Sequence, residues 1–226
     1  MAVTISPDTI KFLADLDKNN NREWFLANKK RYDAAKKNVE DFVDALITRV
    51  AKFEPAVANF KAKDCMFRIN RDVRFSANKA PYKNNMGAYI SKGGKKSSGP
   101  GYYIHIQPNN IFLAGGCWMP EAADLKKIRD AIDYDYEAFE KIVTSKEAKK
   151  MFGALSEDDR LKTAPKGYPK DHPGLEYLKN KSFIFYHKID AKEAVKPNFD
   201  DVVITGFKSI KPLNDYLSQA LEYTED

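Results

Sequence analysis

One segment of the chain alternates apolar and polar residues and places polar side chains where they could bind an anion. Apolar residues at alternate positions from Cys65 to Phe75 predict a strand over residues 65–74. Its other face would carry four polar side chains, those of Arg68, Asn70, Asp72 and Arg74. Two guanidinium groups around an amide and a carboxylate, on a rigid strand, offer donors suited to a phosphate or carboxylate group. We therefore predict that these four residues bind a ligand.

Two further segments would extend this surface. A loop leaves the predicted strand and can fold back over its polar face, and residues 103–107 alternate in the same way, which places His105 and Gln107 on the side of Tyr103. If both strands belong to one sheet, their polar rows face the same side, and the sequence leaves open whether the rows are neighbours. The predicted ligand-binding set is completed by Lys79, Tyr82, Lys83 and Tyr103.

His105 is the candidate catalytic residue. It is the one group on the predicted surface that titrates near neutral pH, so it would serve as general acid or base if the protein is an enzyme. Asp72 is a poor base, because the flanking Arg68 and Arg74 would lower its pKa, and an orienting role suits it better. The sequence does not decide whether a reaction follows binding.

The positive charge of the chain is concentrated in this region. Residues 61–100 contain ten Lys or Arg against two Asp and no Glu, whereas the formal net charge of all 226 residues is only +6. Such a local excess indicates either an anionic partner or a solvated patch. An anionic small molecule is the first expected partner.

Three alternatives remain open. Arg68, Asp72 and Arg74 could form an ion-pair ladder on the solvated face of an antiparallel sheet. The basic face could meet an acidic protein partner. A nucleic-acid binding module is the third alternative, with stacking or contact surfaces from Tyr82, Tyr89, Tyr102 and Tyr103.

Other chemistries have little support in the sequence. No His, Cys or acidic residues show metal-ligand spacing, so neither a metal nor another cofactor is expected. The loop Gly93–Gly99 lacks the order of residues of a phosphate-binding loop. Cys117 with His105 as base could act as a nucleophile, but a cysteine after a run of small apolar residues is more typical of buried packing.

The pattern of elements predicts the α+β class, with a central antiparallel sheet packed by N-terminal and C-terminal helices. We expect one domain over residues 1–226, with a helical part at 6–54, a sheet at 65–118 and a mixed, mostly helical part at 120–223. Ser6-Pro7-Asp8 starts a first helix and Asn21 caps a long second one, while Pro212 should break or restart the last helix. The remaining predicted strands are 85–91, 102–107, 110–118 and 182–189.

The N-terminus lacks the pattern of a signal peptide, and the uncharged stretch 97–120 is interrupted too often for a membrane helix. The two cysteines, Cys65 and Cys117, suit reduced thiols. We therefore expect a cytoplasmic protein that does not enter a membrane. The oligomeric state is left open.

Several of these residues together resemble a known signature. The basic segment is similar to that of the uncharacterised family catalogued as domain of unknown function 2461, and further motifs follow in the family's order along almost the whole chain. The matching residues are Phe67-Arg68-Ile69, Arg71-Asp72, Arg74-Phe75-Ser76, Lys79, Pro81-Tyr82-Lys83, Tyr103 to Pro108, Ala114-Gly115-Gly116, Pro120, Leu125 to Arg129, Pro165 to Tyr168, Asp171-His172-Pro173, Lys181-Ser182 and Pro212-Leu213. The resemblance implies one family unit. It implies no reaction, substrate or cofactor.

Overall fold

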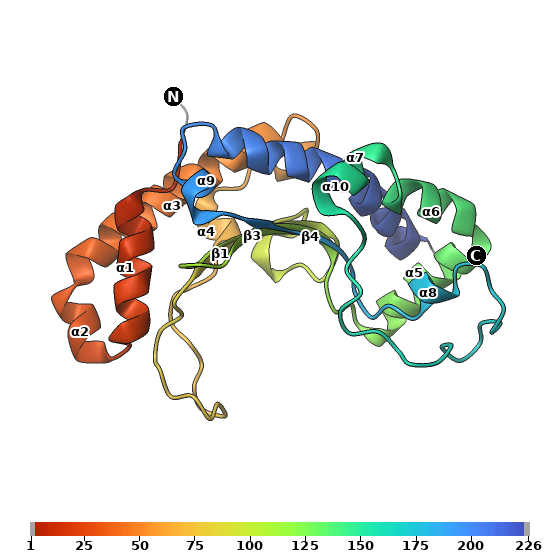
Figure 1. Cartoon of the computed structure of the whole chain (residues 1–226), viewed down its shortest axis with the longest axis horizontal. Helices are drawn as coiled ribbons and strands as arrows, with labels where there is room; N and C mark the ends of the chain where they lie inside the picture. Colours follow the sequence, from red (N-terminus) through yellow and green to blue (C-terminus); the bar gives the residue numbers. More distant parts are fainter. Residues whose placement is uncertain (1–2, 224–226) are drawn as a thin grey trace. The chain divides into compact units, whose positions relative to one another are not determined.

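The computed structural model describes residues 3–223, and it confirms the α+β class (Figure 1). The order of the helices and strands is α1 Pro7–Lys18, α2 Arg22–Ala27, α3 Lys29–Val50, η1 Pro55–Val57, α4 Ala62–Cys65, β1 Met86–Ile90, η2 Gly94–Lys96, β2 Gly101–Ile106, β3 Ile111–Cys117, α5 Ala122–Tyr134, α6 Tyr136–Val143, α7 Lys146–Phe152, α8 Leu175–Leu178, β4 Phe183–Ile189, α9 Ala191–Ala194 and α10 Phe199–Glu222. Across the described residues, the helices and strands alternate in blocks rather than as repeated βαβ units.

The four strands form one antiparallel sheet in the order β1-β2-β3-β4. Short connections join β1 to β2 and β2 to β3, and β4 arrives from far along the chain to complete the edge beside β3. The strands predicted at 85–91, 102–107, 110–118 and 182–189 correspond to these four within two residues at each end. The sheet therefore begins at Met86, and it includes β4 as well as the central segment.

The strand predicted at 65–74 is wrong. Cys65 ends α4, and the chain after it pairs with residues 82–88 only at two isolated bridges, Met66 to Ala88 and Asn70 to Tyr82. The backbone of Phe67 bonds to that of Gly87, and the backbone of Ile69 bonds to that of Lys83. Between these two bonds the first limb has one residue, Arg68, whereas the second limb has three, residues 84–86. The register therefore shifts and the ladder is interrupted, so the segment is extended and alternating without forming a strand.

The result is an irregular hairpin over residues 66–88 that projects beyond β1 (Figure 1). Two further backbone bonds close it, from Lys83 N to Ile69 O at 2.8 Å and from Arg71 N to Pro81 O at 2.9 Å. We call residues 72–80, beyond the last of these bonds, the tip loop.

The N-terminal helices begin as their residues predict, with one difference. Ser6 Oγ accepts from the backbone of Asp8, and Asn21 Oδ1 accepts from that of Trp24. The predicted long second helix is divided at Asn28, which has φ −104° and ψ 18° and whose side chain donates to Trp24 O. An asparagine offers its own side chain to the backbone and so ends α2 locally, before α3 begins one residue later.

The expected break at Pro212 is also wrong, because α10 continues through this residue. Proline removes one backbone donor from a helix. The apolar side chains of Ile210, Leu213 and Leu217 on both sides of it are completely buried, and this packing holds the helix together across the missing bond.

The contacts divide the chain into two compact units, each made of several stretches of sequence. Unit 1 contains the chain up to Lys95, Tyr103–Leu113 and Lys188–Thr205. Within it, the ring of Phe42 on α3 stacks on that of Phe199 at 5.2 Å, and the backbone of Ile5 donates to Ala194 O. Residues 188–205 are thereby packed into a unit formed mainly by the first 95 residues.

Unit 2 contains Lys96–Tyr102, Ala114–His187 and the chain from Gly206 onward. Its core joins α6 to β4, where Phe139 packs edge-on against Phe183. At Gly116, where φ is +122°, a Cβ atom would lie 2.0 Å from Phe183 O. Only glycine permits this close approach of β3 to β4. The prediction of one domain over 1–226 stays a prediction.

Candidate functional site

Tyr103, His105 and Gln107 form a hydrogen-bonded row along β2 and its exit, which we call the polar row. Their side chains are half-buried, whereas Tyr102, Ile104 and Ile106 between them are buried, so the predicted alternation of this strand is correct. Tyr103 Oη lies 2.9 Å from His105 Nδ1, and His105 Nε2 lies 2.9 Å from Gln107 Oε1. One strand thus aligns three polar side chains in a single chain of hydrogen bonds.

The row fixes the tautomer of the neutral His105 ring. Because Gln107 Oε1 accepts, Nε2 carries the proton, and Nδ1 accepts from the Tyr103 hydroxyl. Burial lowers the pKa of His105, the hydrogen bond to Gln107 opposes this, and the positive charge of Lys83 lowers the pKa further. Burial raises the pKa of Tyr103 to about 12. Both groups are therefore neutral near pH 7, and both ring nitrogens of His105 are occupied.

Aromatic rings and a glycine hold the polar row in place. Phe112 on β3 stacks on His105, with ring centroids 4.6 Å apart and an angle of 15°. On the other side, the Tyr103 hydroxyl extends over β1 at Gly87, where a Cβ atom would lie 2.5 Å from Oη. Phe67 meets the Tyr103 ring at 6.3 Å, in an edge-on arrangement. The row is consequently a rigid surface and not a set of mobile side chains.

Arg68 and Lys83 lie next to this row at the base of the hairpin, and we call them the cation pair. The pKa of Lys83 is lowered by burial and by the positive charge of Arg68, and Lys83 in turn acts on His105. Lys83 Nζ lies 5.5 Å from the centre of the Phe67 ring. Within residues 3–223 neither cation takes part in an ion pair with a carboxylate. The site is electropositive, partly desolvated and bordered by aromatic rings.

Arg74, Asp72 and Lys79 lie in the tip loop, apart from the cation pair along the hairpin. Arg74 binds Asp72 in a bidentate manner, at 3.0 Å and 2.7 Å, and this guanidinium lowers the pKa of Asp72. Lys79 Nζ donates to the carbonyl oxygens of Val73 and Arg74. Asp72 and Arg74 therefore form a local ion pair of the loop, and the orienting role expected for Asp72 stays a prediction.

The structure gives the other two predicted ligand residues different surroundings. Tyr82 is buried and stacks on Phe25 of α2 at 3.9 Å, so its ring packs in the core of unit 1. Asn70 is exposed and pairs through its backbone with Tyr82. The eight predicted ligand residues and His105 therefore fall into three groups: the cation pair with Tyr103 and His105 beside it, the tip loop, and the segments that connect the two.

Sequence reasoning missed three residues that shape the site. Arg71 was the one residue that departed from the alternation, and its guanidinium donates to Ala80 O at 3.0 Å and to Ser76 Oγ. Phe67 belongs to the apolar face of the predicted strand and Phe112 was not a candidate, but both line the site with half-exposed rings. The departure of Arg71 from the pattern was the available signal that the segment turns there.

Both cysteines are buried, free thiols. Burial raises the pKa of Cys117 to about 12 and that of Cys65 to about 11, so both remain thiols. Cys117 Sγ donates to Ser98 O. His172 belongs to unit 2, where its Nδ1 accepts from the backbone of Gly174. Among the described residues, no group of three or more His, Cys, Asp or Glu side chains is placed to hold a metal ion.

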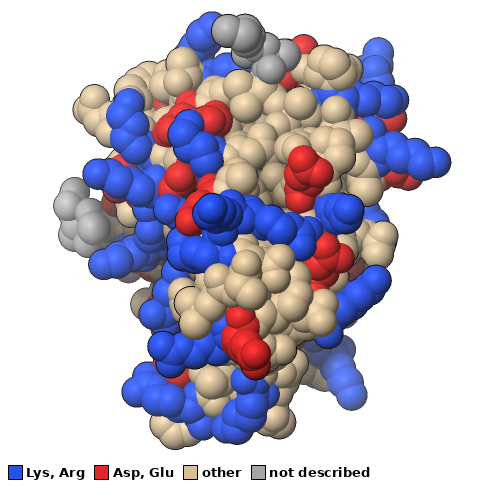
Figure 2. Space-filling view, turned by 90° about the vertical axis from the view of Figure 1, so that its left-hand side faces the viewer, with Lys and Arg blue, Asp and Glu red and all other residues tan. Residues whose placement is uncertain are grey.

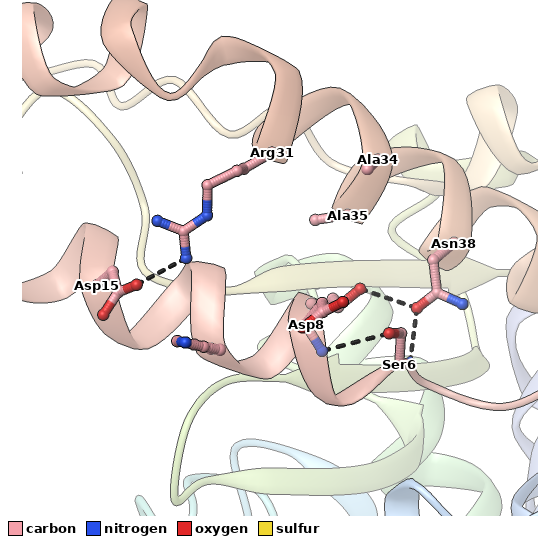
Figure 3. Close-up of a pocket in the computed structure, with 9 residues that line it drawn as sticks. Ser6, Asp8, Asp15, Arg31, Ala34, Ala35 and Asn38 are labelled. Carbon is pink, nitrogen blue, oxygen red and sulfur yellow. Dashed lines mark hydrogen bonds and ion pairs between the residues drawn. The ribbon is translucent and has the colours of Figure 1, made fainter.

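A cavity of about 550 Å³ lies between α1 and α3 (Figure 3). It is polar, but its central groups bind one another. Arg31 binds Asp15 at 2.6 Å, and Asn38 Oδ1 accepts from Ser6 N and from Thr9 Oγ1. Ala34 and Ala35 leave the space open without offering chemistry. We therefore do not place the functional site there.

Elsewhere in unit 1 several surface cations have acidic partners. Figure 2 shows the face on the side of α2, where acidic side chains are interspersed among Lys and Arg. On α3, Lys36 pairs with Glu40 at 3.0 Å and Lys37 with Asp41 at 2.6 Å. Arg68 and Lys83 differ from these residues because no carboxylate pairs with them in the described chain.

A comparison with known families matches residues 8–216 to the one described as conserved hypothetical protein (DUF2461). The chain belongs to the DUF2461 family. This match confirms the resemblance drawn from the motifs, over nearly the full length. The comparisons with curated proteins and with solved structures gave no match. No helix among the described residues of this DUF2461 protein is long and apolar enough to cross a membrane. Family membership brings no reaction, so the chemistry rests on the geometry.

Proposed function

We propose that this DUF2461 protein binds a ligand carrying a phosphate or carboxylate group at the cation pair, beside the polar row of β2. The observation that carries the proposal is that Arg68 and Lys83 stand within electrostatic reach of each other without a paired carboxylate in the described chain. Lys83 is partly removed from water, and the like charge of Arg68 near it destabilises the free protein. An anion between them would relieve this repulsion and gain charge-assisted hydrogen bonds.

The two cations would have different roles. The guanidinium of Arg68 can bind two oxygens of a planar or tetrahedral anion at once, whereas the Lys83 ammonium acts as a point charge. Asp72, the carboxylate in electrostatic reach of Arg68, is already held by Arg74. It therefore competes weakly with a ligand.

While both of its hydrogen bonds are formed, His105 would position its neighbours and would not itself react. Its two ring nitrogens hold Tyr103 and Gln107, and for His105 to act as general acid or base one of these bonds must open. We therefore propose that His105 fixes Tyr103 and Gln107 next to the bound anion, and that any reaction would begin with the exchange of one of these bonds for a bond to the ligand.

The test is a titration with inorganic phosphate, followed by isothermal calorimetry or by chemical shifts. We expect Arg68→Gln and Lys83→Gln each to weaken phosphate binding by about tenfold, since a hydrogen bond to a charged group contributes about 1.5–3 kcal/mol. Lys37→Gln is the matched control, because this lysine of the same unit is paired with Asp41. Equal affinities in all three variants would contradict the proposal.

A cytoplasmic location is also part of the proposal. Cys65 and Cys117 are both buried and both free. Free thiols suit a reducing compartment. Fractionation of cells that express the tagged protein would test this location, and recovery of the protein outside the cytoplasmic fraction would contradict it.

A further inference from the structure

The tip loop presents one aromatic side chain to solvent. Phe75 is 96% exposed, more than any other large apolar residue among those described. The Arg74 guanidinium lies 5.9 Å from the centre of its ring. A phenyl ring so exposed contributes nothing to the core, and it costs free energy in water unless a partner covers it.

The loop that carries Phe75 is held by its own side chains. Arg71 binds Ala80 O and Ser76 Oγ, Lys79 Nζ binds Val73 O, and Asn78 Oδ1 accepts from Ala80 N at 2.9 Å. The bonds of Arg71 and Lys79 connect the two limbs of the loop below the tip, and that of Asn78 holds the backbone of one limb. The position of Phe75 at its end is therefore a consequence of ordered contacts and not of a missing core.

The same combination of groups occurs at both ends of the hairpin. At the base, Lys83 lies over the ring of Phe67, which is 39% exposed, and at the tip Arg74 lies over the ring of Phe75. Between them, Arg71 and Lys79 are bound to neutral oxygens, so their positive charges are not cancelled. Along one projecting segment the chain thus repeats an aromatic ring with a cation, although the cation at the tip, Arg74, is also paired with Asp72.

A partner that matches this arrangement carries anionic groups and planar rings at regular intervals along its chain. Single-stranded nucleic acid does so, because its phosphates follow one another along the chain and its unpaired bases stack on aromatic side chains. An anionic membrane surface fits less well, since Ser76, Ala77 and Asn78 beside Phe75 provide little apolar area to insert.

We propose that the hairpin of residues 66–88 binds single-stranded nucleic acid, with a phosphate at the cation pair and a base stacked on Phe75. This inference rests on the proposed function for its base, and it adds a second contact at the tip. Tyr82 and Tyr102 take no part, because both rings are buried. The stacking residues are instead Phe75 and Phe67.

The experiment measures fluorescence anisotropy of a labelled single-stranded oligonucleotide of mixed sequence, with wild type, Phe75→Ala and Phe75→Tyr. We expect Phe75→Ala to weaken binding by about tenfold, within the loss seen when a base loses its aromatic partner, and Phe75→Tyr to retain it. The matched control is Tyr134→Ala, because Tyr134 is 93% exposed but lies between Asp133 and Asp135. It should leave the affinity unchanged.

Inorganic phosphate, titrated against the same variants, separates this inference from the proposed function. Phe75→Ala should leave phosphate binding intact, whereas Arg68→Gln should weaken the binding of both phosphate and oligonucleotide. Failure of phosphate to bind wild type would overturn the proposed function and with it the phosphate contact proposed here.

If Phe75→Ala leaves the affinity for the oligonucleotide unchanged, the inference is overturned, but the proposed function is not. The inference would also be overturned if the protein bound vesicles rich in anionic lipid through Phe75 and did not bind the oligonucleotide. Melting curves should be the same for wild type and Phe75→Ala, because the ring has no contacts in the core to lose.

Discussion

At the scale of single residues, the polar row shows how a sheet can hold a histidine in one protonation state. Tyr103 donates to Nδ1 and Gln107 accepts from Nε2, and both neighbours lie two residues away on the same strand or its exit. Phe112 covers one face of the ring. Burial favours the neutral form of the ring, and the hydrogen bond to Gln107 opposes this effect in part.

The first prediction concerns the stability of the protein between pH 5 and 8. The pKa of His105 is lowered by burial from its value of 6.5 in the unfolded chain, so at acidic pH the unfolded chain binds a proton that the folded protein does not. The contribution of His105 to the free energy of unfolding is complete above 6.5, and it is lost as the pH falls through the folded pKa. One proton limits the slope to about 1.4 kcal/mol per pH unit.

Urea unfolding at a series of pH values, in a buffer without phosphate, would measure this contribution. His105→Gln should flatten the dependence below pH 6.5, and the titration of the His105 ring in NMR spectra should give the folded pKa directly. A folded pKa at or above 6.5 would be incompatible with the burial described. His187→Gln, a change outside the polar row, serves as the control.

At the scale of elements, side chains and not a continuous ladder hold the hairpin to unit 1. Asn20, in the turn between α1 and α2, donates through Nδ2 to Tyr82 O at 2.9 Å and accepts at Oδ1 from Tyr82 N at 3.1 Å. The Tyr82 ring stacks on Phe25 of α2. This clamp lies one residue from Lys83, so the position of the cation pair depends on the turn before α2.

The second prediction is that Asn20→Ala loosens the hairpin. The substitution leaves the N–H and C=O of the buried Tyr82 without partners, and each such group costs about 1–3 kcal/mol. We expect the free energy of unfolding to fall by about 2 kcal/mol and hydrogen exchange to speed up around residues 69–83. Asn84→Ala is the control, because the bond of Asn84 to Asp17 is exposed and its loss should cost at most about 0.5 kcal/mol. Equal losses in the two variants would show that the clamp does not hold the hairpin.

The elements also show what a sequence can and cannot predict. Alternation located β1 to β4 and the polar row correctly, because each depends on neighbours two residues apart. The same alternation at 65–74 was misleading. An extended segment becomes a strand only if its register with its neighbour stays constant. Here three residues lie opposite the single residue Arg68, so the register with residues 82–88 shifts. The proximity of Lys83 to Arg68, and the burial of Tyr82 on Phe25, depend on this tertiary pairing and have no local signal.

At the scale of the whole molecule, the placement of charge distinguishes the candidate site from the rest of the surface. The sequence shows an excess of cations at residues 61–100, but it does not show which of them have acidic partners. In the structure, Arg74 is paired with Asp72, as Lys36 and Lys37 of α3 are with Glu40 and Asp41, while Arg68 and Lys83 have no paired carboxylate within residues 3–223. Composition therefore locates the region, and only the fold shows that Arg68 and Lys83 within it lie in electrostatic reach of each other.

The whole chain is also needed to complete unit 1, because residues 188–205 join it from far along the sequence. Arg49 near the end of α3 binds Asp200 and Asp201 at the start of α10, each at 2.6 Å. Asp200 is only 9% exposed, and its Oδ1 has no hydrogen-bond partner among the described residues. Its carboxylate therefore depends on Arg49, and so does the attachment of this late segment to the first helices.

The third prediction is that Arg49→Met destabilises the protein by about 3 kcal/mol, the lower end of the cost of leaving one member of a buried ion pair without its partner. The double variant Arg49→Met with Asp200→Asn should recover part of this loss, because the stranded charge is gone. Urea unfolding of wild type, both single variants and the double variant forms a cycle that isolates the pair. Lys37→Met, which breaks an exposed pair on the same helix, should cost at most about 1 kcal/mol. If Arg49→Met and Lys37→Met lower the free energy of unfolding equally, Arg49 behaves as an ordinary surface residue. Residues 188–205 would then be held to unit 1 by apolar contacts such as that of Phe42 with Phe199.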